Sequence, residues 1–264
     1  MGERKMKEII PITEDEFNNI VAQTGFTYAL MLKDYYVTII LYLLKDVKGI
    51  YFKGGTALNK IFLEYARISE DVDYSVSKDL KVVEKEIREI IKDCPFFHSV
   101  THDKRVNKFT RLIAHYKGFD NEESTVFIDL NEKADLVLKP EEHRIPHHYP
   151  ENVPSFSVMT LAKKEMMAEK VAATIGRNKP RDHFDVYMIL KHKQPLDLKL
   201  VKKKCESSGN EFNIIKMFNK AKKLKNKWDE DMAPLLAETI TFQEIMQTLA
   251  KHFDLKKEKD KLKK

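Results

Sequence analysis

The sequence predicts an α+β fold, with a mixed β-sheet and flanking helices in residues 1–150 and a helical C-terminal domain in residues 151–264. In the first part, segments of alternating apolar and polar residues, which are typical of strands, are interspersed with segments of helical periodicity. From Val158 onward, the pattern is helical nearly to the C-terminus. The stretch from Glu141 to Pro154 is the expected linker, and its histidines are expected to be exposed to solvent: His143, His147 and His148.

Two helices are expected before the first strand. Thr13 and Glu16 have the spacing of a capping box, in which each side chain bonds the other residue's backbone N–H, so the first helix begins here and ends near Gln23. The second helix extends from about Tyr28 to Leu44. Its longest apolar stretch has ten residues, whereas a membrane-spanning helix needs about 20. We therefore expect a buried helix.

A strand, a glycine turn and a helix are expected next. The short apolar run Ile50–Phe52 is followed by Gly54 and Gly55, and Thr56 begins a segment with apolar residues at helical spacing. Glycines allow backbone N–H groups to approach an anion, and the N-terminus of a helix carries partial positive charge. The turn therefore predicts a cradle for a triphosphate, with an ordinary strand-to-helix turn as the alternative. No GxxxxGK(S/T) sequence occurs, which disfavours a P-loop NTPase.

Three further strands and one helix complete the predicted sheet region. Apolar and polar residues alternate strictly in Asp71–Val76 and in Val126–Leu130, as expected of strands with one buried face. Phe109–Tyr116 is expected to form another strand, and Val82–Ile91 a helix. The order of these elements favours a mixed sheet with helices on one side.

Two aspartates are the centre of the predicted site. Asp71 and Asp73 are two residues apart, so both side chains leave the same face of their strand. At an effective dielectric constant near 20, like charges about 4 Å apart repel by roughly 4 kcal/mol, a cost that a divalent cation reverses. Mg²⁺, with Mn²⁺ as the alternative, suits such oxygen ligands. Asp129 is the predicted third carboxylate of a two-metal site, with Asp120 and Asp135 as rivals. An exposed structural role for the pair is the alternative.

Composition and charge indicate a globular chain with a charged surface. The formal net charge is +6 and the pI is about 9.0. Such a surface attracts polyanions such as nucleotides or RNA over roughly 8 Å at physiological salt, although a Lys-rich surface without a nucleic-acid partner is the alternative. Cys94 and Cys205 are far apart and form no CxxC, so neither a disulfide framework nor a zinc site is expected. The charged N-terminus leads into no signal-peptide apolar region, and a reducing cytoplasm is the expected location.

Two sequence signatures resemble a known family. Lys-Gly-Gly-Thr-Ala-Leu-Asn-Lys at 53–60, followed by Arg-Ile-Ser-Glu-Asp-Val-Asp at 67–73, is similar to the KGGT(A/S)L…K…R-x-SED(I/V)D signature of the AbiEii/AbiGii toxins. Residues 168–177 and Arg-Asp-His-Phe-Asp at 181–185 are similar to the AEK(L)xAxxxR…RDxxD motif of that family, and Lys-Asp-Tyr-Tyr at 33–36 also resembles it. These toxins are nucleotidyltransferases of type IV toxin–antitoxin systems, and the MenT-type tRNA-modifying toxins are related to them.

The resemblance implies a polymerase-β-like nucleotidyltransferase domain and a Mg²⁺-dependent enzyme that transfers a nucleoside monophosphate from an NTP to a hydroxyl, releasing pyrophosphate. It also implies an RNA acceptor, with a tRNA 3′ end as the leading candidate, a toxin role in abortive infection, and a cognate antitoxin, often a helix-turn-helix regulator encoded nearby. No membrane partner is expected. Together with Asp129, which the strand pattern supplies, the predicted site residues are Asp71, Asp73, Asp129 and Lys170 for catalysis, the same three aspartates for the metal, and Lys53, Gly54, Gly55, Thr56, Lys60, Arg177, Arg181, Asp182 and Asp185 for the nucleotide.

The second signature also has a physical interpretation of its own. Lys170 and Arg177 are seven residues apart, which is two helical turns, so they share a face that suits a triphosphate. Lys170 would act as a point charge, whereas Arg177 or Arg181 would hold phosphate oxygens in bidentate fashion. Asp182 and Asp185 are expected to orient these cations or the nucleotide. A solvated, charged helix with internal salt bridges is the alternative.

Two alternative functions are compatible with the same residues. One is a nucleotidyltransferase that acts on protein hydroxyls or on a small molecule. The other is a catalytically silent module that binds nucleotides or RNA. The intact carboxylate pair, Asp71 and Asp73, argues against the silent module, because binding alone does not require it.

Overall fold

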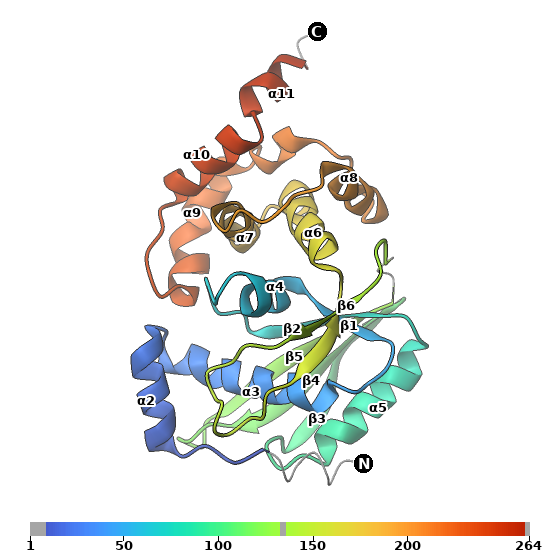
Figure 1. Ribbon diagram of the computed structural model, residues 1–264, viewed down its shortest axis with the longest axis vertical. Coiled ribbons are helices and arrows are strands. Elements are labelled where there is room, and N and C mark those ends of the chain that lie inside the picture. The colour runs from blue at the N-terminus through green and yellow to red at the C-terminus, as the bar shows by residue number, and fades with distance from the viewer. Residues whose placement is uncertain (1–8, 133–135, 262–264) are drawn as a thin grey trace. The chain divides into compact units, whose positions relative to one another are not determined.

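The computed structural model describes residues 9–132 and 136–261 of the chain (Figure 1). The chain divides into two compact units, Met1–Ala162 and Lys163–Lys264. The first contains a seven-stranded mixed sheet with helices packed against it, and the described part of the second is helical, which confirms the predicted α+β class. The division follows Ala162 rather than residue 150 because Ser157–Thr160 forms a strand of the sheet.

Capping residues determine where the first helices begin and end. The predicted capping box is present: the Thr13 N–H donates to Glu16 Oε2 at 2.9 Å, and the Glu16 N–H donates to the Thr13 hydroxyl at 3.3 Å. Gly25, with φ of 74°, ends the first helix in the left-handed conformation, and the Thr27 hydroxyl caps the second. The helices of the first unit are α2 (Glu14–Thr24), α3 (Tyr28–Leu44), α4 (Gly54–Phe62) and α5 (Leu80–Lys92).

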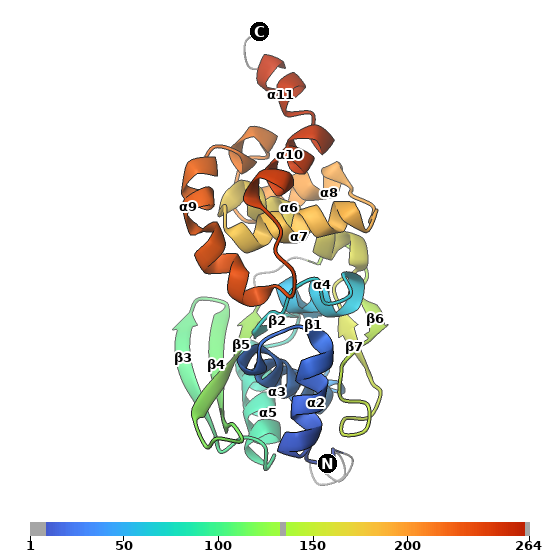
Figure 2. The ribbon, with the colours of Figure 1, turned by 90° about the vertical axis from the view of Figure 1, so that its left-hand side faces the viewer.

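The strands of the first unit are β1 (Ile50–Lys53), β2 (Asp71–Val76), β3 (Ser99–Val106), β4 (Phe109–Lys117), β5 (Glu123–Asn131), β6 (Glu141–Arg144) and β7 (Ser157–Thr160). They form one sheet in the order β3-β4-β5-β2-β1-β7-β6, with β3 at one edge and β6 at the other (Figure 2). The pairs β2–β5 and β1–β7 are parallel, and the other pairs are antiparallel. The sheet is therefore mixed.

Three of these strands differ from the sequence prediction. β6 and β7 pair with each other, although the sequence predicts a linker for one and a helix for the other. Each has only four residues, and most β6 residues are exposed, so no apolar alternation marks them. β3 has a polar run, Thr101–Arg105, and forms an edge strand because its backbone pairs with β4. Short strands and edge strands thus lack the apolar alternation on which the prediction depends.

Helices α3 and α5 pack on one face of the sheet (Figure 1). α3 is buried along most of its length, as the sequence predicts, and no single helix in the described part of the chain is long and apolar enough to cross a membrane. The pleat places alternate side chains on opposite faces, so Asp71, Asp73 and Asp129 lie on the face away from the core. The sheet residues on the core side include Val72, Tyr74, Val126, Ile128 and Leu130, all 2% exposed or less.

The second unit is built around α6 and α7. α6 contacts α7, α8 and the 3₁₀ helix η1, while α7 contacts α9 and α10. Pro180 lies in the first turn of α7, where backbone N–H groups have no partner within the helix, so the N–H that proline lacks costs no helical hydrogen bond. The elements are α6 (Lys163–Gly176), α7 (Pro180–Lys191), α8 (Leu198–Ser207), η1 (Ile214–Met217), α9 (Ala221–Met232), η2 (Ala233–Leu235), α10 (Phe242–His252) and α11 (Leu255–Lys261).

Candidate active site

Four charged residues form a row across four neighbouring strands of the first unit, on the sheet face away from α3 and α5. Lys53 of β1 is opposite Asp73 of β2, Asp73 is in register with Asp129 of β5, and Asp129 is opposite Arg111 of β4. Residues paired in this way project from the same face of a sheet. This charged row (Lys53, Asp73, Asp129 and Arg111) therefore places two carboxylates side by side between two cations. Asp71, two residues before Asp73 on β2, projects from the same face.

Gly54 allows the Asp73 carboxylate to approach the N-terminus of α4. The residue has φ of +80°, a left-handed conformation that side chains disfavour, and a Cβ atom placed on it would lie 2.2 Å from Asp73 Oδ2. The cap residue Lys53 makes no side-chain hydrogen bond to the helix N-terminus. In an α-helix the first N–H groups have no partner within the helix and carry partial positive charge. The aspartate pair and the anion-attracting helix end are therefore adjacent.

Gly55 brings a buried guanidinium against the same turn. A Cβ atom on Gly55 would lie 2.7 Å from Arg67 Nη2 and 3.2 Å from Ser69 Oγ. Arg67 is 1% exposed, and its Nη1 donates to the Ile68 carbonyl oxygen at 3.1 Å. Both Arg67 and Ser69 belong to the Arg-x-Ser-Glu-Asp signature, but the sequence alone assigns them no role. The structure shows that they pack behind the glycine turn.

Thr56 has a structural position in the turn. Its side chain is buried, with the residue 1% exposed, and its hydroxyl donates to the Asp71 carbonyl oxygen at 2.5 Å. This hydrogen bond ties the first turn of α4 to the beginning of β2. The Thr56 side chain therefore positions Asp71, and the contribution of Thr56 to triphosphate binding stays a prediction.

Lys60 differs most from its predicted role. Its Nζ lies 2.6 Å from Asp34 Oδ1, and it donates to the Thr38 hydroxyl at 3.1 Å and to the Tyr65 hydroxyl at 2.8 Å. Both charged side chains are 2% exposed. Burial lowers the pKa of Lys60, and the charge of Asp34 opposes that shift. Lys60 is therefore an internal partner of Asp34 rather than the nucleotide ligand that the sequence predicts.

Two histidines lie beside this buried pair. The His148 ring is 4.5 Å from the Tyr65 ring, centroid to centroid, and the His147 Nδ1 accepts a hydrogen bond from the Tyr149 N–H at 3.3 Å. Burial lowers the pKa of His147 to about 4, and the charge of Lys60 adds to that effect. Burial also lowers the pKa of His148. These two side chains are partly buried rather than exposed as predicted, because their stretch packs against α3 within the first unit, where the Tyr149 hydroxyl donates to the Met31 carbonyl oxygen at 2.9 Å.

The free energy of unfolding is therefore expected to fall as the pH is lowered from about 6.5 to about 4. In this window the unfolded chain protonates His147 while the folded chain keeps it neutral, so acid favours the unfolded state. Urea unfolding of wild type and His147→Gln at pH 7 and pH 5 checks this. The variant should lose less stability between the two pH values. An equal loss in both proteins would show that His147 does not contribute to the acid sensitivity.

Asp129 is held by Arg111. The Arg111 Nε and Nη2 donate to the two oxygens of Asp129, both at 2.7 Å, and the guanidinium lies 4.9 Å from the Phe127 ring centroid. The hydrogen bonds to Asp129 raise the pKa of Arg111 above its ordinary value. Of the two rivals, Asp120 accepts the Glu122 N–H in the turn between β4 and β5, and Asp135 lies outside the described residues. Asp129 is thus the carboxylate that the fold places beside Asp73.

Two of the three predicted carboxylates have an arrangement that fits a metal ion. Asp71 and Asp73 are partly exposed and offer hard oxygen ligands from one face of β2, which suits Mg²⁺. Asp129 differs, because Arg111 occupies both of its oxygens. Across residues 9–132 and 136–261, no group of three or more His, Cys, Asp or Glu side chains is arranged to hold a metal. The geometry therefore fits two protein carboxylates, and the third ligand, Asp129, stays a prediction.

The second signature forms a compact ion-pair cluster within the second unit. Lys170 Nζ of α6 lies 3.2 Å from Asp182 Oδ1 and 2.9 Å from Asp185 Oδ2 of α7. Arg177 binds both Asp182 oxygens at 2.7 Å, and its side chain is 54% exposed whereas both aspartates are 0% exposed. Burial alone would raise the pKa of Asp182, but Lys170 and Arg177 hold it well below its ordinary value.

The cluster agrees with both interpretations of the second signature, a phosphate-binding site and a set of internal salt bridges. Asp182 and Asp185 orient Lys170, and Asp182 also orients Arg177, while the same contacts are internal salt bridges. Arg181 is only partly exposed, at the beginning of α7. The role of the cluster at the nucleotide stays a prediction.

Two solved structures share the fold. The nucleotidyltransferase toxin MenT4 from Mycobacterium tuberculosis H37Rv is 21% identical, with a TM-score of 0.59, over 80% of this chain and 72% of that one. JHP933 from Helicobacter pylori is 18% identical, with a TM-score of 0.59, over 90% of this chain and 98% of that one. No match to the chain was found among curated proteins.

The family described as nucleotidyl transferase AbiEii toxin, type IV toxin–antitoxin system, matches residues 43–249. The match includes the glycine turn, the charged row and the ion-pair cluster, and it extends over well more than half of the chain. It therefore also covers α8, α9 and the first part of α10, which carry neither sequence signature. The chain belongs to the AbiEii family of nucleotidyltransferase toxins of type IV toxin–antitoxin systems.

Proposed function

We propose that this toxin transfers a nucleoside monophosphate from an NTP to a hydroxyl group of RNA, with Mg²⁺ as cofactor and pyrophosphate as the second product. A tRNA 3′ end is the leading candidate acceptor. The observation that carries the proposal is the charged row, in which Asp73 and Asp129 lie side by side next to the glycine-led N-terminus of α4. Carboxylates beside an anion-attracting helix end are the two features that a metal-bound triphosphate needs.

Asp71 and Asp73 are the residues that would hold the metal. A bound Mg²⁺ supplies charge neutralisation for the phosphates and lowers the pKa of a coordinated hydroxyl. Mn²⁺ would suit the same oxygen ligands. Arg111 keeps Asp129 in place next to Asp73 by donating one hydrogen bond to each of its oxygens, and each oxygen keeps a second lone pair with which Asp129 could accept a proton. Arg111 is thus a positioning residue for the proposed base.

The triphosphate would be bound by backbone and side-chain groups of different kinds. The N–H groups at Gly54 and Gly55 begin α4, and the Lys53 side chain projects from the sheet face that carries the aspartates. From the second unit, Lys170 would contribute a point charge, and Arg177 and Arg181 have guanidinium groups suited to bidentate phosphate contacts. Asp182 and Asp185 would keep Lys170 oriented before the nucleotide arrives.

An RNA acceptor agrees with the basic character of the chain, whose net charge is +6. The toxin–antitoxin family implies a cognate antitoxin. We propose that this antitoxin is encoded nearby, as a helix-turn-helix regulator, and that the reaction takes place in the cytoplasm, where tRNA is present.

Incorporation of each radiolabelled NTP into tRNA tests the proposal. Wild type should label tRNA with one or more NTPs in the presence of Mg²⁺, and labelling should fall to background with EDTA or in Asp71→Ala. Equal labelling by Asp71→Ala would refute the assigned mechanism. If protein or metabolite extracts were labelled but RNA never was, the acceptor would be a protein or a small molecule instead of RNA. NTP binding that is indifferent to Mg²⁺ in calorimetry, without any transfer, would indicate a silent binding module.

A further inference from the structure

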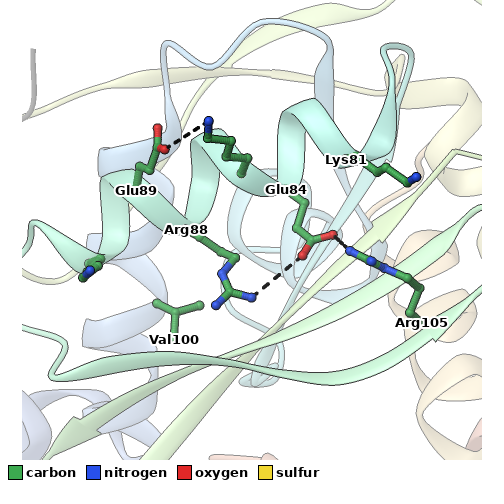
Figure 3. Close-up of a pocket in the computed structure, with 8 residues that line it drawn as sticks. Lys81, Glu84, Arg88, Glu89, Val100 and Arg105 are labelled. Atoms are coloured by element: carbon green, nitrogen blue, oxygen red, sulfur yellow. Dashed lines mark hydrogen bonds and ion pairs between the residues drawn. The ribbon is translucent and has the colours of Figure 1, made fainter.

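A basic groove lies between α5 and β3 in the first unit (Figure 3). Its volume is about 480 Å³, and its cationic lining residues are Lys81, Lys85, Arg88, Lys92 and Arg105. The other described residues that line it are two glutamates, Glu84 and Glu89, and Val100, so the formal charge of its described lining is +3. None of these residues belongs to the charged row, to the glycine turn or to either sequence signature.

The α5 cations of the basic groove form a stripe along one helix face. Lys81, Lys85, Arg88 and Lys92 are separated by four, three and four residues, which returns each to the same side of the helix. From Lys81 to Lys92 the stripe rises by eleven residue steps, which corresponds to about 16 Å along the helix axis. A stacked nucleic-acid strand carries one phosphate per roughly 3.4 Å, so a strand lying along this face would present several phosphates to it.

Glu84 organises the base of the groove. Its side chain is 8% exposed, and its oxygens contact His102 Nε2 at 2.6 Å, Arg88 Nη1 at 3.9 Å, and Arg105 Nη2. Figure 3 shows Arg88 from α5 and Arg105 from β3 both directed at this carboxylate. A buried carboxylate thus fixes two guanidinium groups in the groove, while the three lysines of the stripe remain exposed.

The register of the sheet connects the basic groove to the charged row. Lys104 of β3 is opposite Arg111, and Arg111 is opposite Asp129. Adjacent strands are about 4.8 Å apart, which places the Lys104 backbone roughly 10 Å from that of Asp129. Lys104 and Arg105 project to opposite faces of the edge strand β3. Cations therefore continue from the groove, over the sheet edge, to the guanidinium that holds Asp129.

We infer that the basic groove binds the phosphate backbone of the acceptor RNA, upstream of the hydroxyl that is modified. This inference rests on the proposed RNA acceptor. A protein partner is disfavoured, because protein interfaces depend on buried aromatic and apolar anchors, and Val100 alone is apolar among the lining residues within 9–132 and 136–261. The part of the lining that the structure describes offers no aromatic side chain for base stacking, so binding there is expected to be independent of sequence and sensitive to salt.

The test uses the full-length chain and fluorescein-labelled oligouridylate of ten nucleotides, with affinity measured by anisotropy at several salt concentrations. The triple variant Lys81→Gln/Lys85→Gln/Lys92→Gln is expected to bind 10- to 100-fold more weakly than wild type at about 0.15 M salt. The slope of log affinity against log salt should become shallower by about 2, because each phosphate contact to a single strand contributes roughly 0.7. With RNA as acceptor, KM for the RNA should rise while kcat stays unchanged.

The matched control is Lys199→Gln/Lys202→Gln/Lys203→Gln on α8, which removes the same charge from another exposed face. Unchanged affinity of the groove variant, absence of oligouridylate binding by wild type, or an equal loss in the control would overturn the inference. Poly-glutamate that binds as tightly as the RNA, with the same dependence on the three lysines, would instead identify a surface for an acidic protein. Because anisotropy needs no turnover, groove-dependent binding without transfer would refute the proposed function and leave the groove assignment intact.

Discussion

Replacement of Gly54 by alanine is expected to lower nucleotidyl transfer by about 100-fold or more, because displacement of a reactive group by about 1 Å is enough for such a loss. The added Cβ would lie 2.2 Å from Asp73 Oδ2 and 2.8 Å from Asp73 Cγ, so the carboxylate cannot stay where it is. The left-handed backbone at this residue, with φ of +80°, adds about 1–2 kcal/mol of strain. The measurement is the transfer rate under the conditions that label the wild-type acceptor.

Gly209→Ala is the matched control for this substitution. Gly209 has φ of +72°, and a Cβ atom on it would meet nothing within 4 Å. This variant should therefore lose about 1 kcal/mol of stability from backbone strain and keep its transfer rate. If Gly54→Ala and Gly209→Ala had the same activity, the approach of Asp73 to the glycine would have no catalytic importance.

The second large effect is expected for Lys60→Met, which should lower the free energy of unfolding by about 3–5 kcal/mol. The substitution keeps most of the side-chain volume but leaves the Asp34 carboxylate, which is 2% exposed, without the charge that lies 2.6 Å away. Denaturant unfolding followed by circular dichroism measures the loss.

The comparison for Lys60→Met is Lys202→Met, which breaks an exposed pair with Glu206 whose N–O separation is 3.9 Å and whose side chains are 61% and 59% exposed. Such surface pairs contribute about 0–1 kcal/mol. A similar small change in both variants would mean that the Asp34–Lys60 pair is solvated in solution. Retention of NTP binding by folded Lys60→Met would further separate its internal role from the role that the sequence predicts.

Local patterns account for the parts of the fold that the sequence predicts well. The bounds of α3 agree with the prediction, and α2 begins at its capping box, because caps and helical periodicity are encoded within a few residues. β2 and β5 were also predictable from alternation. That Asp129 joins Asp71 and Asp73 was a hypothesis, and its register with Asp73 could not be derived, since register between segments 56 residues apart depends on the whole sheet.

The differences at the candidate site have a common physical origin. A periodic pattern shows that Lys60 belongs to a helix but does not show that Asp34, from a different helix, neutralises it in the interior. Arg111 was missed for a similar reason: it is one cation in an ordinary strand until the β4–β5 register places it on Asp129. Partners that come from distant segments decide whether a charged residue faces a ligand or another side chain.

The hydrogen bond from Thr56 to the Asp71 carbonyl and the contact of Gly54 with Asp73 join α4 and β2 at two points. Because the two elements meet at these points, a displacement of the helix end is expected to carry both acidic residues with it. The spacing between phosphate cradle and acidic residues is thus built in before substrate arrives, and little ordering entropy is lost there on binding. Adaptation to a different nucleotide or acceptor would have to arise in surrounding parts of the protein.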